Sequence, residues 1–313
     1  MRDQDLNQLI DSLIQQEHLP ADYRQTAKRV VLPLAQDLSE RACAAGQPLL
    51  VGINGAQGTG KSTLSLFLKT LLTEVFGCPS ACVSLDDIYL TLAEREHLAE
   101  TVHPLLKTRG VPGTHDLVLG QQVIDQLKTV SEGEHVAIPA FDKASDDRFS
   151  HSRWPVLEGP VKVILLEGWC LGARHEPDVG TLEAPINELE RDEDRDGAWR
   201  RYVNQRLATD YREFFDQLDC LIMLKAPSME CVLKWRTLQE HKLAQQRTVA
   251  PNECGSAAAM PSRIMSDEQV RRFIMHYERI TRATLSEMPA RADVLINVDE
   301  AHGLAMPVFS ELA

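Results

Sequence analysis

The sequence lacks a long apolar segment and a secretion signal. No hydrophobic run approaches the roughly 20 residues that a membrane-spanning helix needs. The opening stretch, MRDQDLNQLIDSLIQQEH, is polar and acidic and has neither the basic nor the apolar region of a signal peptide. We therefore expect a cytoplasmic protein that has no membrane partner.

Positive charge is also scarce. The chain has 33 lysines and arginines against 46 aspartates and glutamates, so its formal net charge is -13 at pH 7. A strongly acidic protein is repelled by a phosphate backbone, which excludes nucleic acid as an expected partner. If the ligand is itself anionic, the protein must gather its cations locally, and basic residues near a candidate site become informative.

The cysteines and histidines follow no metal-binding pattern. The seven cysteines are odd in number and include no C-x-x-C pair, and the ten histidines show no metal-ligand spacing. Neither a disulfide framework nor a zinc site is predicted. Reduced thiols in a cytoplasmic protein are the simplest interpretation of Cys43, Cys78, Cys82, Cys170, Cys220, Cys231 and Cys254.

What the sequence does contain is a strand–loop–helix pattern over residues 49–72. An apolar run over 49–53 is typical of a buried strand, and it is followed by GAQGTGKS, which fits G-x-x-x-x-G-K-[ST]. Because a strand precedes this loop and a helical pattern follows it, we predict a phosphate-binding P-loop rather than a chance glycine-rich turn before a lysine. The helical pattern consists of Leu64, Phe67, Leu68, Leu71 and Leu72.

Each part of the motif has a physical role. Glycines permit the backbone conformations that aim N–H groups at phosphate oxygens, and the helix N-terminus adds partial positive charge. Lys61 is expected to reach the β- and γ-phosphates of ATP, and the Ser62 hydroxyl to ligate Mg²⁺. The predicted nucleotide-binding residues are Gly55, Ala56, Gln57, Gly58, Thr59, Gly60, Lys61, Ser62 and Thr63.

Strand-like and helix-like segments alternate along the rest of the chain. This alternation predicts an α/β fold of the P-loop NTPase type, with three layers, a mainly parallel sheet and the site at the carboxyl ends of the strands. We expect a helical N-terminal extension over 1–46, a P-loop domain over 47–300 and a C-terminal tail over 301–313. Further strands are predicted at 81–85, 136–138, 161–166, 220–224 and 294–298.

Two segments stand apart from this alternation. The acidic stretch 183–196 is expected to be a solvated loop or insertion. The stretch 248–261 consists of small residues without periodicity and is expected to be a loop.

Acidic residues follow two of the predicted strands. Asp86 and Asp87 follow CVSL, and Glu167 follows VKVILL. Parallel strands bring their carboxyl ends to one edge, so these acids are expected near the P-loop, where one accepts the alcohol proton and others hold Mg²⁺ directly or through water. Asp86 is our choice for the base, with Ser62, Asp86 and Glu167 as the metal set. The alternatives are a helix N-cap pair for the two aspartates and a surface acid for Glu167.

Five sequence blocks together resemble the D-glycerate 3-kinase family. That family belongs with uridine kinase, phosphoribulokinase and bacterial pantothenate kinase among the P-loop small-molecule kinases. The resemblance covers roughly residues 47–300, and the order and spacing of the blocks agree. The blocks are GINGAQGTGKST, VSLDDIYLT, RGVPGTHDL, IPAFDKASDDR and SRWPVLEGPVKVILLEGWCLG.

The resemblance implies roles on the acceptor side. Asp86 matches the aspartate beside the acceptor hydroxyl, although the pair leaves the base open between Asp86 and Asp87. Tyr89 matches an aromatic acceptor-side residue, or else it is a core tyrosine. His115 and Asp116 fall in the acceptor-binding region, where Asp116 either bonds a substrate hydroxyl or caps the helix that begins at residue 117.

A carboxylate acceptor also requires cations. A glycerate-like acid favours an arginine or lysine clamp. For each candidate alone a solvated surface charge is the favoured alternative, but because the rest of the protein is acidic we expect at least one of them to be a clamp. The candidates are Arg109, Lys143, Arg148 and Arg153.

The resemblance further implies a helical lid over about 226–265. There Lys234 and Arg236 would stabilise charge on the transferring phosphoryl group and help exclude water. The alternative is a basic helix face docked on acidic surface. Trp169 either walls the acceptor pocket or fills core.

The sequence therefore predicts an ATP-dependent kinase for a small hydroxyl compound, and the resemblance implies D-glycerate, converted to 3-phosphoglycerate. The alternatives are a kinase of the same group for uridine, pantothenate or a sugar phosphate, and a nucleotide-driven switch that phosphorylates nothing. The switch is disfavoured because neither an N-K-x-D nor an LSGGQ-like motif is present. The sequence does not indicate an oligomeric state.

Overall fold

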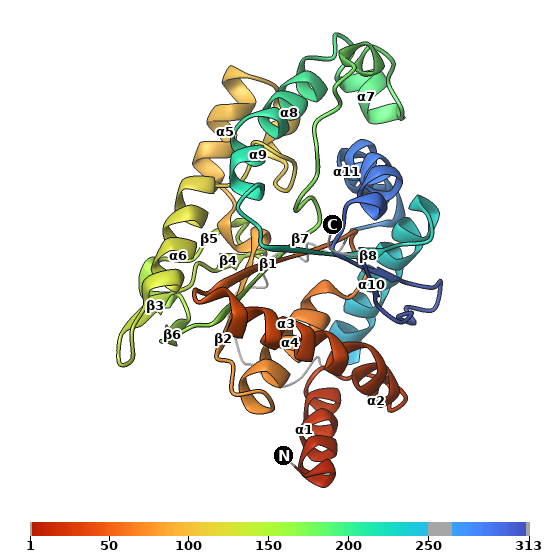
Figure 1. Ribbon diagram of the computed structural model, residues 1–313. Helices are drawn as coiled ribbons and strands as arrows, with labels where there is room; N and C mark the ends of the chain where they lie inside the picture. Colours follow the sequence, from red (N-terminus) through yellow and green to blue (C-terminus); the bar gives the residue numbers. More distant parts are fainter. Residues whose placement is uncertain (1, 250–264, 311–313) are drawn as a thin grey trace, which may run out of the picture.

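A six-stranded sheet forms the middle layer of the molecule. The computed structural model describes residues 2–249 and 265–310. The strand order is β10-β9-β8-β1-β7-β2 (Figure 1). The strands are β1 (Leu49–Gly55), β2 (Ser80–Ser84), β7 (Val163–Gly168), β8 (Cys220–Lys225), β9 (Val294–Asn297) and β10 (Val308–Phe309).

Five of these strands run parallel, which confirms the predicted fold class. β10 alone pairs antiparallel, with β9. The interior strands are almost continuously apolar because helices cover both faces of the sheet, and all seven residues of β1 are buried. The carboxyl ends of β1, β2 and β7 therefore meet at one edge, beside the P-loop.

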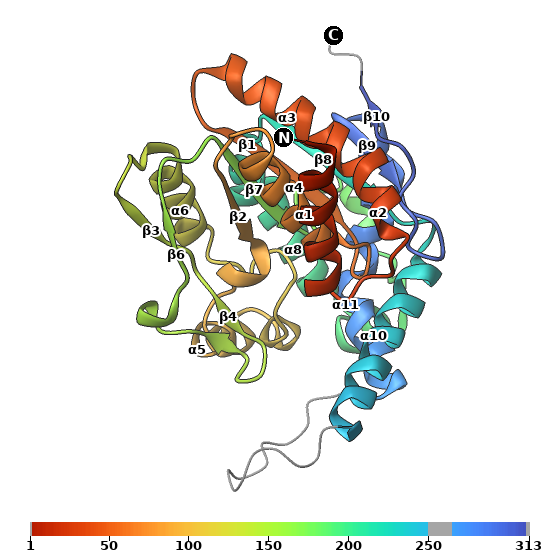
Figure 2. The ribbon, with the colours of Figure 1, turned by 90° about the horizontal axis from the view of Figure 1, so that it is seen from below.

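Helices complete the outer layers. In Figure 1, α3 and α4 lie on one side of the sheet and α8, α9 and α11 on the other. Figure 2, seen from below, shows α1, α3 and α4 in front of the strands. The helices are α1 (Asp3–Gln16), α2 (Tyr23–Thr26), α3 (Leu32–Ala45), α4 (Lys61–Glu74), α5 (Leu92–Thr101), α6 (Leu117–Thr129), α7 (Glu188–Glu193), α8 (Ala198–Ala208), α9 (Asp210–Phe215), α10 (Met229–Val249) and α11 (Asp267–Glu287).

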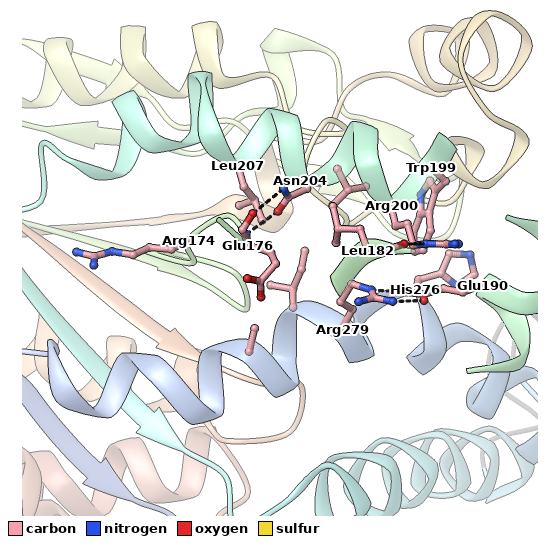
Figure 3. A pocket seen from close by; sticks show the side chains of 13 residues that line it. Arg174, Glu176, Leu182, Glu190, Trp199, Arg200, Asn204, Leu207, His276 and Arg279 are labelled. Carbon is pink, nitrogen blue, oxygen red and sulfur yellow. Dashed lines mark hydrogen bonds and ion pairs between the residues drawn. The ribbon is translucent and has the colours of Figure 1, made fainter. Parts of the chain in front are cut away.

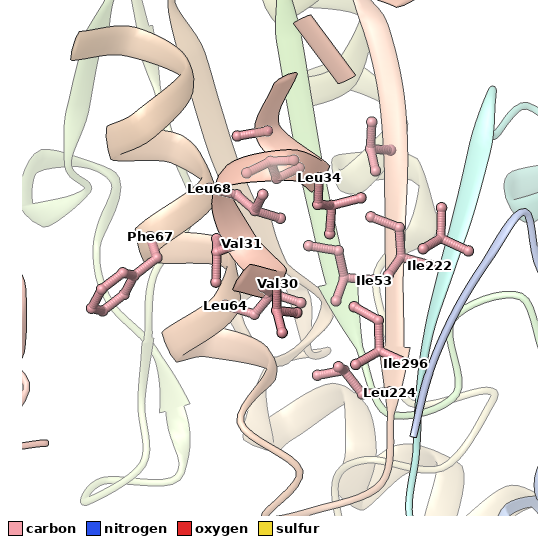
Figure 4. Close-up of a cluster of buried hydrophobic side chains, with 14 of the residues drawn as sticks. Val30, Val31, Leu34, Ile53, Leu64, Phe67, Leu68, Ile222, Leu224 and Ile296 are labelled. Atoms are coloured by element: carbon pink, nitrogen blue, oxygen red, sulfur yellow. The ribbon is translucent and has the colours of Figure 1, made fainter. Parts of the chain in front are cut away.

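The helices before residue 47 are part of the main core. A π-helical turn over Ala27–Val31 leads directly into α3, which packs on α4. Val30, Val31 and Leu34 are at most 2% exposed and meet α4 and the strands (Figure 4). Their partners in this cluster are Leu64, Phe67, Leu68, Ile53, Ile222, Leu224 and Ile296.

Small antiparallel pairs lie at the end of the molecule that carries α5 and α6. Figures 1 and 2 both place them opposite α10 and α11. One pair joins β3 and β6, and the other is the β4–β5 hairpin. Their bounds are β3 (His135–Ala137), β4 (Phe141–Asp142), β5 (Asp147–Arg148) and β6 (Val156–Glu158).

The acidic segment 183–196 is more ordered than the sequence suggested. It contains α7, whose N-cap Asn187 accepts a bond from the Glu190 N–H. Glu190 and Asp194 are fully buried, because Arg279 pairs with the first at 2.6 Å and Arg200 with the second at 2.9 Å. Both cations come from other helices, so charge composition alone did not reveal their burial.

Other boundaries differ in smaller ways. Part of the predicted C-terminal tail forms β10, and α10 continues to Val249, into the stretch predicted as a loop. Residues 250–264 of the predicted loop and lid lie outside the described residues. Within the described ranges, no helix has the length and apolar character to cross a membrane, and the six cysteines there are unpaired.

Candidate active site

The predicted P-loop joins β1 to α4 in the conformation that the motif implies. Gly58 and Gly60 have φ angles of 84° and 89°, a left-handed region that favours glycine. A Cβ on Gly55 would lie 2.5 Å from the Thr59 hydroxyl, so close packing explains this position too. The loop's backbone therefore turns sharply and delivers the chain to the N-terminus of α4, where free amides face anions.

Side chains of the loop brace its backbone. The Thr59 hydroxyl donates to the Ala56 carbonyl at 2.8 Å, and the Lys61 Nζ lies 3.4 Å from the same carbonyl. Gln57 is half-buried, whereas Ser62 at the start of α4 is exposed, and Thr63 is half-buried behind it. Lys61 and Ser62 thus stand at the helix N-terminus, where the sequence placed them.

Glu167 joins three elements. In the sheet its register partners are residues 53 of β1 and 84 of β2. Its carboxylate accepts hydrogen bonds from Ser62 Oγ at 3.1 Å and Ser84 Oγ at 3.0 Å. Ser84 also accepts a bond from the Asp86 N–H at 3.2 Å. Glu167, the penultimate residue of β7, is therefore held against the P-loop serine, and its metal-organising role stays a prediction.

The donors around Glu167 suit a hard cation. Hydroxyl and carboxylate oxygens from Ser62, Glu167 and Asp86 are the ligand types that Mg²⁺ takes, usually with several retained waters. Ser62 Oγ is already within hydrogen-bonding distance of the Glu167 carboxylate. Ser62 and Glu167 therefore fit a magnesium ion that arrives with nucleotide phosphates, while a metal contact of Asp86 stays a prediction.

The pKa values of the two aspartates after β2 are shifted in opposite directions. Burial would raise the pKa of Asp86, but Lys143, the Tyr89 hydroxyl and Lys61 favour its charged form and bring the pKa down to about 2. Burial raises the pKa of Asp87 to about 6, helped by the Asp86 charge and despite a bond from the Phe141 N–H. Ser84, not an aspartate, caps this turn, so the N-cap alternative does not describe the pair.

The loop before α6 lies against Tyr89, whose hydroxyl bonds to Asp86. Backbone hydrogen bonds join residues 88–90 to residues 114–116. The buried Tyr89 donates to Asp86 Oδ1 at 2.5 Å, and its ring packs against the His115 ring with centroids 4.9 Å apart. Asp116 caps α6 by accepting from the Leu119 N–H at 3.0 Å. The substrate contacts of these residues stay predictions.

Four predicted clamp cations occupy different settings. Lys143 pairs with Asp86 at 2.9 Å and Arg148 with Asp116 at 2.8 Å. Arg109 pairs with Asp146 and lies over the Phe141 ring. Arg153 is exposed and stacks on Phe149, 4.0 Å from the ring centroid. Lys143 is therefore the candidate that stands at the proposed base.

The first half of the predicted lid rests on the P-loop. A Cβ on Gly58 would lie 2.9 Å from the Trp235 side chain, so α10 packs directly against the loop. Arg236 pairs with Glu240 at 2.5 Å, while Lys234 is exposed. A role for either cation in phosphoryl transfer stays a prediction.

Sequence reasoning missed several groups of this site. Ser84 links Glu167 to Asp86, Asp146 holds Arg109 and the fully buried Arg95, and His302 bonds to the Gly58 carbonyl at 3.0 Å. Only Ser84 carried a signal, because it directly precedes the acidic turn. Trp169 is buried, and its Nε1–H donates a hydrogen bond to the Gly110 carbonyl oxygen at 2.8 Å.

A separate small cavity lies between α8 and α11 (Figure 3). Its volume is about 50 Å³, room for one or two water molecules. Within the described residues, Trp199 Nε1 and His276 Nε2 line it without a protein hydrogen-bond partner. Arg279 and Glu190 in its wall pair with each other. The cavity therefore suits buried water rather than a metabolite.

The fold and this edge of the sheet define a P-loop phosphotransferase. No family model matches the sequence. Over 239 residues the chain is 34% identical to the uncharacterized kinase mug58 of Schizosaccharomyces pombe, a match that covers 74% of this chain and 79% of that protein. Weaker similarities extend to bacterial pantothenate and uridine kinases.

Two further similar proteins are named D-glycerate 3-kinase. The chloroplastic enzyme of Arabidopsis thaliana is 31% identical over 268 residues, which covers 81% of this chain and 53% of that enzyme. The structure from Cryptococcus neoformans var. grubii has a TM-score of 0.71 and 25% identity, covering 93% of this chain and 99% of that one. The chain belongs to the D-glycerate 3-kinase-like group of P-loop kinases, related to uridine and pantothenate kinases.

Membership makes the chain a small-molecule kinase and implies ATP as the phosphoryl donor. This confirms the resemblance to the kinase group. The acceptor is a separate question, because the neighbours of this group differ in the alcohol they phosphorylate, as their names show.

Proposed function

We propose that the protein transfers the γ-phosphoryl group of ATP to the hydroxyl of a small hydroxy acid, most simply D-glycerate at its 3-hydroxyl. The observation that carries this proposal is the ionised Asp86 paired with Lys143 at 2.9 Å. Within this one contact, the Asp86 carboxylate can bind the hydroxyl of an alcohol and the Lys143 ammonium can bind the carboxylate of an acid. The two relatives named for D-glycerate support the same acceptor.

The nucleotide side would act through the backbone. P-loop amides, the α4 N-terminus and Lys61 would hold the phosphates, and Lys61 would offset charge that builds on the transferring group. Ser62, Asp86 and Glu167 would hold Mg²⁺, which when bound supplies a positive charge between the phosphate oxygens. Arg236 would leave Glu240 to face the phosphates when the lid closes.

On the acceptor side, Asp86 would orient the alcohol and accept its proton. A low pKa suits this role. In a loose transition state the base mainly has to position the alcohol, and a carboxylate with a low pKa is ionised at any physiological pH. Tyr89, which donates to Asp86 at 2.5 Å, would keep one of its oxygens aimed. The substrate carboxylate would then take Lys143 as its partner in place of Asp86.

An acceptor panel tests this proposal. Purified protein is assayed for ADP release with ATP and Mg²⁺, and with D-glycerate, pantothenate, uridine or a sugar phosphate. We expect turnover with D-glycerate and 3-phosphoglycerate as the product. Robust turnover of another alcohol, with none of glycerate, would reject the acceptor, and ADP release that ignores every acceptor would favour a nucleotide-driven switch.

A further inference from the structure

Tyr211, on α9, holds the loop that precedes α6. It is fully buried, and its hydroxyl oxygen accepts the backbone N–H of Gly113 at 2.9 Å and that of His115 at 3.3 Å. The same oxygen lies 2.6 Å from His115 Nδ1. One side chain from a distant helix thus contacts the loop at three points.

These contacts determine where the proton of the His115 ring lies. The Tyr211 oxygen already accepts two N–H groups, so among the described residues the partner left for its own hydrogen is the lone pair of His115 Nδ1. Burial also lowers the pKa of His115 to about 4, which keeps the ring neutral. A neutral ring that accepts at Nδ1 carries its hydrogen on Nε2.

That Nε2–H has no partner among the residues that the structure describes. His115 is 4% exposed, and its Nε2 is buried without a hydrogen bond among the described residues. A buried donor without a partner is unfavourable, so a ligand oxygen that satisfies it gains affinity. The His115 ring packs against Tyr89, whose hydroxyl reaches the proposed base.

We propose that Tyr211 is a positioning residue that keeps His115 in its Nε2–H form, so that the acceptor site presents an uncharged donor to a substrate oxygen. The substrate part of this inference rests on the proposed function. A neutral donor complements the charged Lys143. It selects acceptors that carry an additional oxygen and disfavours analogues that lack it, because the analogue leaves the donor unpaired.

The first experiment measures the tautomer directly. Nitrogen-15 NMR of the histidine rings distinguishes a protonated from a bare nitrogen. We expect wild-type His115 to carry hydrogen on Nε2 alone, and Tyr211→Phe to give a mixture of tautomers. Tyr202→Phe is the matched control, because Tyr202 also packs against Gly113 but makes no hydrogen bond to His115. A wild-type ring protonated on Nδ1 would overturn the proposal, and this result does not depend on which acceptor is used.

Kinetics test the substrate part. We expect Tyr211→Phe and His115→Phe each to lower kcat/KM for D-glycerate by about 10-fold or more, with KM for ATP unchanged. The double variant should lose no more than either single one, because Tyr211 acts through His115. The singles should also narrow the preference for D-glycerate over 3-hydroxypropionate, which lacks one hydroxyl.

Three results would contradict this part. They are additive losses in the double variant, an unchanged preference between the two acids, and an equal loss in Tyr202→Phe. If the wild type phosphorylates neither acid, the proposed function fails, while the NMR result still decides whether Tyr211 sets the tautomer.

Discussion

The two halves of the site are built in different ways. The phosphate side is one continuous loop, in which backbone amides and a helix N-terminus supply the polarity. The acceptor side joins side chains from the turn after β2, the loop before α6 and the β4–β5 hairpin through ion pairs. A phosphate would therefore bind mainly to backbone amides, whereas the proposed acidic acceptor would have to displace an internal partner of Lys143.

This difference separates affinity from selectivity. Backbone amides bind phosphate oxygens, which all nucleoside triphosphates share, so these amides distinguish poorly between one triphosphate and another. At Lys143, by contrast, a ligand would be favoured only if its own carboxylate took the position that the Asp86 carboxylate occupies. Changes on the phosphate side should thus affect all reactions alike, and changes on the acceptor side should depend on the alcohol.

The largest effect is expected at Lys61. Lys61→Ala should lower kcat by about 10³-fold with every acceptor, because one preorganised cation is lost from the transferring group. Lys69→Ala, on the same helix, serves as the control and should retain turnover. A Lys61→Ala variant that keeps wild-type turnover and nucleotide-dependent thermal stabilisation would remove the basis for the phosphate side.

Asp86→Asn should come next. We expect kcat to fall by about 10²–10⁴-fold while KM for ATP stays near its wild-type value, because the amide cannot accept the alcohol proton. Steady-state kinetics at saturating ATP provide the measurement. If instead Asp87→Asn alone abolishes turnover and Asp86→Asn does not, the base is Asp87.

Lys143→Met should act on one substrate only. Loss of a charged hydrogen bond should raise KM for a hydroxy acid about 10- to 100-fold and leave KM for ATP unchanged. Lys107→Met is a close control, because Lys107 also forms an exposed pair with a carboxylate, Glu96, at 2.9 Å. An equal effect of Lys143→Met on a neutral alcohol would show that Lys143 does not recognise the acid.

The smallest effect concerns stability. The native pKa of Asp87, about 6, lies above its ordinary value, so its contribution favours folding below about pH 4 and is lost as pH rises through about 6. Asp87→Asn should therefore stabilise the protein by about 1–2 kcal/mol at pH 7 and have less effect at pH 4. Urea unfolding at both pH values measures this, and destabilisation at pH 7 would contradict the raised pKa.

The same contrast decides how much the sequence could predict. The P-loop and the parallel sheet follow from local patterns, since spacing and periodicity are properties of neighbouring residues. The acid of the hairpin that holds Arg109 is 37 residues from it, and Tyr211 is 96 residues from His115. Such pairs arise only when the fold brings distant segments together, so no local pattern revealed them.

Buried charged residues were the second feature that the sequence could not predict. The acidic stretch 183–196 reads as solvated until Arg200 and Arg279 are placed beside Asp194 and Glu190. Roles at Tyr89, Arg109, His115 and Arg153 were taken from resemblance, and the structure supplies their surroundings while their contacts with substrate stay predictions.

The packing of the first helices has a practical consequence. Val30, Val31 and Leu34 pack against α4 and the strands of the sheet. A truncation that removes residues 1–46 would expose Leu64, Leu68 and one face of the sheet to water. A shortened protein of that kind should aggregate, and its inactivity would then say nothing about catalysis.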